Sequence, residues 1–240
     1  MLEITNLAGG AVIGAGLAWI LERWVINLYD HVSAADLEKF PQKTAENSSK
    51  LFSCWRIFAG MSIATAALSV WRQWNPILLS DLILVTTLVG IAWIDRKTLL
   101  IEGRLVALAM GLRFAWLSFF APQEMLNYLT GLLVGAGLLY FVGFLYEIFR
   151  YRQGLGEGDP ALLGLIGMWV GWQGLGAVLL IAALSGILIG GVSLFRQRKA
   201  NQNIPDLLQT QIPFAPYLCL GGLIVYLLQE TGNDVTGLVF

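Results

Sequence analysis

Two aspartates stand out in this chain because each lies at the end of an apolar run, where a charged side chain is costly. Asp95 ends the run VGIAWID at residues 89–95, and Asp159 follows three alternating glycines in GLGEGDPALL at 154–163. Two carboxylates that meet in a partly dry site repel each other, so their titration is coupled and they share one proton. Such a pair can hydrolyse a peptide bond: the ionised member takes a proton from water while the protonated member polarises the scissile carbonyl.

Each aspartate taken alone also fits a structural role. An aspartate followed by proline and an apolar run is how many helices begin, so Asp159 could cap a helix. Asp95 could be a helix-end carboxylate beside two basic residues. The conjunction of the two at comparable depth favours catalysis, as do the three alternating glycines, which let an irregular backbone pass close to another segment.

No other set of side chains in the sequence competes with this pair. The only histidine, His31, falls in a polar stretch, and the sequence contains neither HExxH nor GxSxG. The two cysteines, Cys54 and Cys219, cannot supply four metal ligands, and they are predicted to lie too far apart in depth to form a disulfide. The sequence therefore predicts no metal site.

The elements that would hold the aspartates are membrane helices. Apolar residues make up 57% of the chain, only 13% of it is charged, and the mean hydropathy is +0.68. These values predict an all-α, polytopic membrane protein with about eight transmembrane helices. The predicted apolar segments cover residues 7–22, 56–71, 76–94, 99–120, 125–149, 160–173, 174–195 and 212–229.

The basic residues predict the orientation of these helices. Of the 15 Lys and Arg residues, all but Arg72 and Arg113 fall in loops on one side of the membrane, so this side is predicted to be cytosolic and both termini to lie outside. An even number of spans must separate the basic residues near 150 from those near 196. This favours two short helices that meet at GWQGLG, residues 171–176, over one long helix.

This topology predicts four parts. A first transmembrane helix with no basic residue before it is expected to be retained rather than cleaved as a signal peptide. A small polar loop domain is predicted in the cytosol, followed by a seven-helix membrane domain that carries the aspartates and by an outer tail. The parts cover residues 1–22, 23–55, 56–229 and 230–240, respectively.

Small and aromatic residues predict how the helices pack. Glycines recur four apart, which lets neighbouring helices approach closely. These pairs are Gly10/Gly14, Gly131/Gly135, Gly167/Gly171 and Gly186/Gly190. Tryptophans near predicted span ends are expected to anchor the helices at the membrane interfaces. They include Trp19, Trp71, Trp74, Trp169 and Trp172.

On these residues the chain resembles the type IV prepilin peptidases, membrane aspartic proteases that are also called leader peptidases. GLGEGD at 154–159 is similar to the GxGD motif of the family, and Ile94-Asp95 ends a helix at a typical separation of 64 positions before Asp159. PFAPYLCLG at 213–221 resembles the PFGP-type final segment of the family. The resemblance extends over about residues 85–228. Presenilin-type proteases share GxGD, but they place their other aspartate on the helix immediately before the motif.

The resemblance implies that Asp95 and Asp159 are the catalytic pair and that Gly156 and Gly158 support it. The implied substrates are prepilins or pseudopilins of a type IV pilus, a type II secretion system or a DNA-uptake machine. Their short basic leader would be cut off at the cytosolic face of the bacterial inner membrane. Candidates to meet this leader flank the pair, and no nucleic acid is expected as a partner. These candidates are Glu102, Arg104 and Glu157.

The sequence departs from the family pattern at three places. Glu102-Gly103 replaces the usual Pro-Asn or Pro-Asp, Pro160-Ala161-Leu162 stands where a lysine is common, and the loop at 23–55 lacks paired CxxC cysteines. Many relatives also methylate the new N-terminus with S-adenosylmethionine, an activity associated with that loop. Proteolysis by the pair needs no cofactor, so S-adenosylmethionine is expected only if methylation is retained.

Two alternatives to a protease remain open from the sequence. The departures at Glu102-Gly103 and Pro160 leave room for a non-catalytic membrane scaffold or assembly factor of the same fold. A proton-coupled transporter could use Asp95 and Asp159 as relay groups, although transporters usually place such carboxylates near the membrane midplane.

Overall fold

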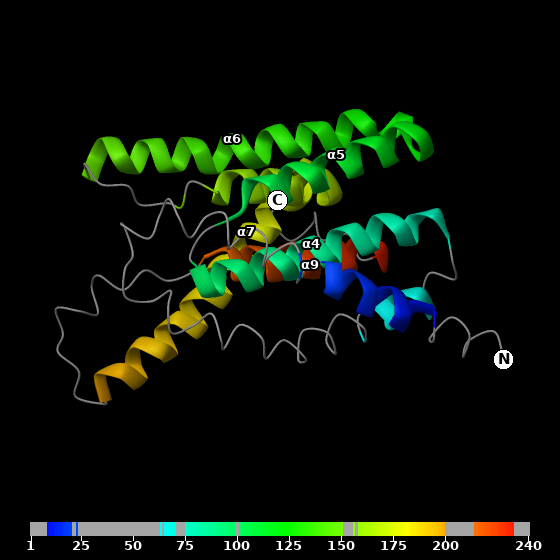
Figure 1. Cartoon of the computed structure of the whole chain (residues 1–240). Coiled ribbons are helices and arrows are strands. Elements are labelled where there is room, and N and C mark those ends of the chain that lie inside the picture. The colour runs from blue at the N-terminus through cyan, green and yellow to red at the C-terminus, as the bar shows by residue number, and fades with distance from the viewer. Residues whose placement is uncertain are drawn as a thin grey trace. The chain divides into compact units, whose positions relative to one another are not determined.

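The computed structural model shows a helical protein. It describes residues 9–20, 23, 63, 65–70, 75–98, 101–150, 156, 158–199 and 214–232. In these ranges the chain forms helices and no strand, which confirms the all-α prediction (Figure 1). The labelled elements are α4 (Pro76–Thr98), α5 (Gly103–Phe120), the short 3-10 helix η1 (Pro122–Glu124), α6 (Met125–Arg150), α7 (Asp159–Lys199) and α9 (Ala215–Glu230).

Four of the described helices are long and apolar enough to cross a membrane, so the protein is a multi-pass membrane protein. They cover Pro76–Arg96, Gly103–Phe120, Pro122–Phe149 and Asp159–Ile189. Two shorter apolar helices, Gly9–Ile20 and Ala215–Glu230, accompany them. The total of eight spans and the outside position of both termini stay predictions, as does the division of the chain into four parts.

The chain divides into two compact units, Met1–Leu82 and Ile83–Phe240. In the first unit, helix Gly9–Ile20 packs closely on the segment at 65–70: a Cβ on Gly10 would lie 2.8 Å from the Cα of Ala66. The Thr65 hydroxyl donates a hydrogen bond of 2.9 Å to the Gly10 carbonyl. The predicted packing role of Gly10 is therefore confirmed. Apart from Arg23, the predicted loop domain at 23–55 lies outside the described residues.

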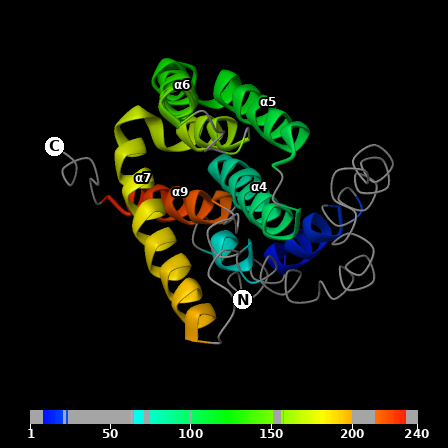
Figure 2. The same cartoon turned by 90° about the vertical axis from the view of Figure 1, so that its left-hand side faces the viewer.

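In the second unit, α6 and the start of α7 lie side by side (Figures 1 and 2). Gly131 and Gly167 face each other backbone to backbone, so that a Cβ on either would overlap the other's carbonyl group. One turn further along α6, a Cβ on Gly135 would lie 2.7 Å from the Leu163 carbonyl oxygen. The prediction that these glycines let helices approach closely is confirmed, and the contact sets how far along α6 the start of α7 lies.

Helix α7 is broken at Gly171, where the backbone has φ 72° and ψ 171°. This conformation is essentially restricted to glycine. Figure 2 shows the bend that results, between a first arm (residues 159–170) and a second arm (residues 172–199). The break lies in the turn predicted at 171–176. Gly171 was also expected to pack between helices as the partner of Gly167. A Cβ on Gly131 of α6 would lie 3.0 Å from the backbone carbon of Gly171, so this glycine both makes the break and lets α6 approach.

The tryptophan prediction is wrong at one position. Trp19 and Trp172 are 56% and 46% exposed, as expected for side chains at a membrane interface. Trp169 is only 2% exposed and lies inside the unit, because the first arm of α7 is buried along its length. Trp71 and Trp74 lie outside the described residues.

Candidate active site

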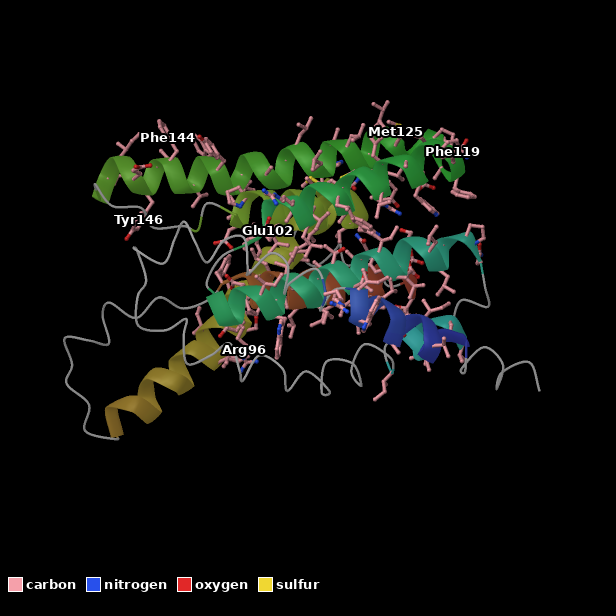
Figure 3. All side chains as sticks on the ribbon, viewed as in Figure 1. Arg96, Glu102, Phe119, Met125, Phe144 and Tyr146 are labelled. Atoms are coloured by element: carbon pink, nitrogen blue, oxygen red, sulfur yellow. The ribbon has the colours of Figure 1, made fainter. Side chains whose placement is uncertain are left out.

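Asp95 lies near the end of α4 and is buried, with 5% of its surface exposed. The next residue, Arg96, is exposed, and Figure 3 shows its side chain pointing away from the unit at this end. The Asp95 carboxylate accepts a hydrogen bond from the backbone N–H of Ala215, the first residue of α9. Its other oxygen, Oδ2, is buried and has no hydrogen-bond partner among the residues that the structure describes.

Helix α9 uses Asp95 in place of a cap of its own. The N-cap residue of α9 is Phe214, which has no side-chain oxygen to accept from the free amides of the first turn. Pro216 in that turn removes one of these donors. The Asp95 carboxylate accepts a hydrogen bond from one of the remaining amides, that of Ala215. The positive end of the α9 dipole favours the negative charge of this carboxylate.

Asp159 is the first residue of α7 and is also 5% exposed. Its N–H donates to the Gly156 carbonyl at 3.2 Å, and its carboxylate accepts a hydrogen bond from the Gly156 amide. The Gly158 carbonyl accepts the first helical bond, from Leu162, at 3.0 Å. The backbone groups of Gly156 and Gly158 thus hold the aspartate at the helix N-terminus.

Each of these two glycines leaves room that the site uses. A Cβ on Gly158 would overlap the side chain of Ile101, which lies between α4 and α5. A Cβ on Gly156 would lie 3.1 Å from Oδ2 of Asp159. The absence of side chains therefore lets the turn lie against the α4–α5 connection and leaves one side of the carboxylate open. Gly154, the first of the alternating glycines, lies outside the described residues.

The two carboxylates lie in one buried place. The negative charge of Asp95 acts on the Asp159 carboxylate, and both charges act on Cys219, a free buried thiol one turn beyond Ala215 in α9. Two buried acids at neighbouring helix N-termini can hold a shared proton and can act on a polar bond as base and acid.

Of the three flanking candidates, the structure describes two. Glu102 lies at the N-cap position of α5, and Arg104 Nε lies 3.9 Å from its Oε1 atom. The Glu102 side chain is 20% exposed and that of Arg104 is 77% exposed. Figure 3 shows Glu102 at the same end of the unit as Arg96, away from Phe119 and Met125. Glu157 lies outside the described residues.

Two features of the unit were not predicted from the sequence. The Ala215 amide is a backbone donor and has no side-chain signature, although the PFAPYLCLG segment that contains it was singled out. Arg113 was noted only as a basic residue within a span, yet it is buried and makes several contacts with other helices. Among the described residues, no three His, Cys, Asp or Glu side chains are grouped so as to hold a metal ion.

The profile of the type IV leader peptidase family matches residues 82–191. The chain is 32% identical over 172 residues to the prepilin leader peptidase/N-methyltransferase of Aeromonas salmonicida, an alignment that covers 71% of this chain and 54% of that protein. The proteins of the same name from Pseudomonas aeruginosa and Escherichia coli are 32% and 30% identical, over 73% and 68% of this chain and 59% and 70% of their own length. The chain thus spans about half the length of the first two relatives. No solved structure matches it.

Proposed function

Because the chain belongs to the type IV leader peptidase family, we propose that it is a membrane aspartic endopeptidase that removes the leader from prepilin-like proteins. In this proposal Asp95 and Asp159 are the catalytic pair. The observation that supports it is that both carboxylates are buried and that the charge of Asp95 acts on Asp159, while Oδ2 of Asp95 has no hydrogen-bond partner among the described residues. A buried oxygen without a hydrogen bond costs free energy, unless a substrate or a water molecule donates a hydrogen bond to it.

The proposed reaction is hydrolysis of one peptide bond. The ionised carboxylate takes a proton from water as the water oxygen forms a bond to the scissile carbonyl carbon, while the protonated carboxyl gives its proton to the carbonyl oxygen. The carbon–nitrogen bond then breaks. The leaving amine takes up the proton first removed from water, and the hydroxyl of the intermediate returns its proton to the other carboxylate. The pair therefore ends with one proton, as it began.

The proposed substrates carry a short basic leader before an apolar membrane helix. The Glu102 carboxylate lies at the α4–α5 connection, whose Ile101 packs against Gly158, so it can attract a positive leader to the pair. Arg104 beside it would limit this attraction, and Glu157 would add to it. We place the protein in the bacterial inner membrane, with the cut at its cytosolic face.

N-terminal methylation is a separate activity, which the relatives carry in their names. It would require S-adenosylmethionine, and the associated loop at 23–55 holds one cysteine, Cys54, instead of the paired CxxC cysteines of many relatives. The proposal is therefore restricted to proteolysis. The mass of the processed product, with or without an added methyl group, separates the two activities.

Co-expression with a prepilin-like substrate tests the proposal. The parent chain is expected to release the leader, whereas Asp95→Ala and Asp159→Ala should each abolish release and still insert in the membrane. Glu147→Ala is the matched control, because Glu147 is an exposed acid in α6. Normal processing by either aspartate variant would refute the assignment of the pair.

Two further outcomes would favour the alternatives. Proton or solute flux that depends on both aspartates, without leader release, would indicate a transporter. A parent chain that inserts and binds the substrate but leaves it uncut would indicate a scaffold.

A further inference from the structure

Arg113 is a buried cation in the middle of an apolar helix. It lies in α5 with 4% of its surface exposed. Its Nε donates a hydrogen bond of 3.1 Å to the Met168 carbonyl of α7. Its guanidinium carbon lies 4.9, 4.9 and 4.8 Å from the ring centres of Trp116, Tyr128 and Trp169, respectively. These rings come from α5, α6 and α7, so one side chain joins three helices.

The break in α7 explains why the Met168 carbonyl accepts from a side chain. In an unbroken helix each carbonyl accepts from the amide four residues later, so the break at Gly171 deprives the last carbonyls of the first arm of their usual donors. Gln229 of α9 supplies a second donor, because its Nε2 lies 3.1 Å from the Val170 carbonyl oxygen. We refer to Arg113 and Gln229 together as the break clamp.

The first arm of α7 and α9 run side by side from the two carboxylates to the break clamp. At one end lie Asp159 and the Ala215 amide that bonds Asp95. Midway, Gly222 packs against Ile166 so closely that a Cβ on Gly222 would lie 2.8 Å from it. At the other end, Gln229 bonds the last carbonyl of the arm. A path of contacts therefore runs from Asp95 along α9 to Gln229, and from there back along the first arm to Asp159.

We propose that Arg113 and Gln229 are positioning residues for the catalytic pair. By fixing the end of the first arm against α5 and α9, they set the register of Asp159 relative to the Ala215 amide, and so relative to Asp95. Helices shift as rigid bodies, and a displacement of about 1 Å can lower a reaction rate about 100-fold. The inference rests on the proposed function, because it concerns the geometry of the same two carboxylates.

A distance measurement tests this positioning independently of activity. The full chain is prepared in membranes with Asp95→Cys and Asp159→Cys, in a background of Cys54→Ser and Cys219→Ala, and the rate of oxidative cross-linking is measured. Arg113→Leu and Gln229→Met are each expected to slow cross-linking at least about tenfold. Leu112→Ala is the matched control, because Leu112 is the neighbouring residue in α5 and is 47% exposed.

Activity in chains that retain both aspartates gives the second readout. Arg113→Leu and Gln229→Met are expected to lower kcat about 10- to 100-fold and to leave KM unchanged, and Arg113→Lys should restore part of kcat because its ammonium can still donate a hydrogen bond. If Arg113→Leu does not accumulate, Gln229→Met decides, because methionine keeps the volume of the glutamine.

Cross-linking at the parent rate in Gln229→Met, or in Arg113→Leu where it accumulates, would overturn the inference. A rise in KM with kcat unchanged would also overturn it, since it would place the residues in substrate binding. Failure of the proposed function would look different: the parent chain would not cleave, while the cross-linking rates would still report on the clamp.

Discussion

The first arm of α7 begins at the Asp159 carboxylate and ends at the Arg113 guanidinium. The buried charges at the two ends differ in how many of their polar atoms have partners. At the break, Arg113 has a carbonyl partner and three aromatic rings around it. At the start, the charge of Asp95, a second buried acid, acts on Asp159, and one oxygen of Asp95 has no hydrogen-bond partner among the described residues. Folding alone favours complete pairing of buried charges. An incomplete pair of like charges points to a site that another molecule completes.

The largest effect is expected at the carboxylate end. Asp95→Asn should lower cleavage at least about 1,000-fold, because an amide can act neither as base nor as acid. The thermal midpoint of unfolding in detergent should not fall, since the change removes a buried charge and keeps an oxygen for the Ala215 amide. Cleavage assays and thermal unfolding of the same preparation check both parts. A lower midpoint together with normal cleavage would show that Asp95 serves stability and not catalysis.

At the break, the backbone itself can be tested. Gly171→Ala places a Cβ on a residue with φ 72° and ψ 171°, which is expected to cost about 1–3 kcal/mol in the free energy of unfolding. Processing should fall as well, because the break sets the direction of the first arm. Gly137→Ala is the control, since a Cβ there meets nothing within 4 Å. Equal unfolding midpoints for the two variants would show that the break can form without glycine.

Two further glycines should separate activity from stability. Gly156→Ala is expected to lower cleavage about tenfold by crowding the Asp159 carboxylate, and to change stability by less than about 0.5 kcal/mol because the residue is exposed. Gly131→Ala should instead cost about 1–3 kcal/mol of stability by pushing α6 away from Gly167. Cleavage and unfolding are measured on both. Loss of stability in Gly156→Ala and loss of cleavage alone in Gly131→Ala would contradict this prediction.

A smaller effect is expected at the rim of the carboxylate site. Glu102→Gln should raise KM for a substrate with a basic leader about two- to fivefold and leave kcat unchanged, the size expected for a partly exposed charge pair. Arg104→Gln should lower KM. Both effects should shrink for a leader whose basic residues are neutralised. An unchanged KM in both variants would remove these residues from leader binding.

Removal of metal ions is expected to leave the rate of cleavage unchanged. The proposed hydrolysis draws only on carboxylates and water, so cleavage in the presence of a strong chelator should match cleavage without it. Inhibition that is reversed by added zinc would show that the reaction needs a metal.

The carboxylate end could be predicted largely from the sequence, whereas the break clamp could not. Asp95 and Asp159 were recognisable because a charge in an apolar run is rare, and the break at 171–176 followed from the even number of spans that the basic residues required. Arg113 carries the same kind of signal. Its partners, however, come from positions 116, 128, 168 and 169, and only the fold brings them together.

Backbone groups and buried aromatics explain the other differences. The Ala215 amide and the Met168 carbonyl exist at nearly every position of any chain, so no pattern of side chains marks them. Trp169 was expected at a membrane interface because it lies near a predicted span end. The bend of α7 and the contact with Arg113 place it inside the unit instead.

The dependence of α9 on Asp95 has a consequence for how the protein matures. The last described helix cannot complete its first turn from its own residues, and the acid that completes it comes from a segment synthesised long before. Until residues 214–218 have been inserted beside α4, both acids are present in the nascent chain but Asp95 lacks the hydrogen bond from the Ala215 amide. For the proposed peptidase, competence to cut would therefore arise only late in biogenesis.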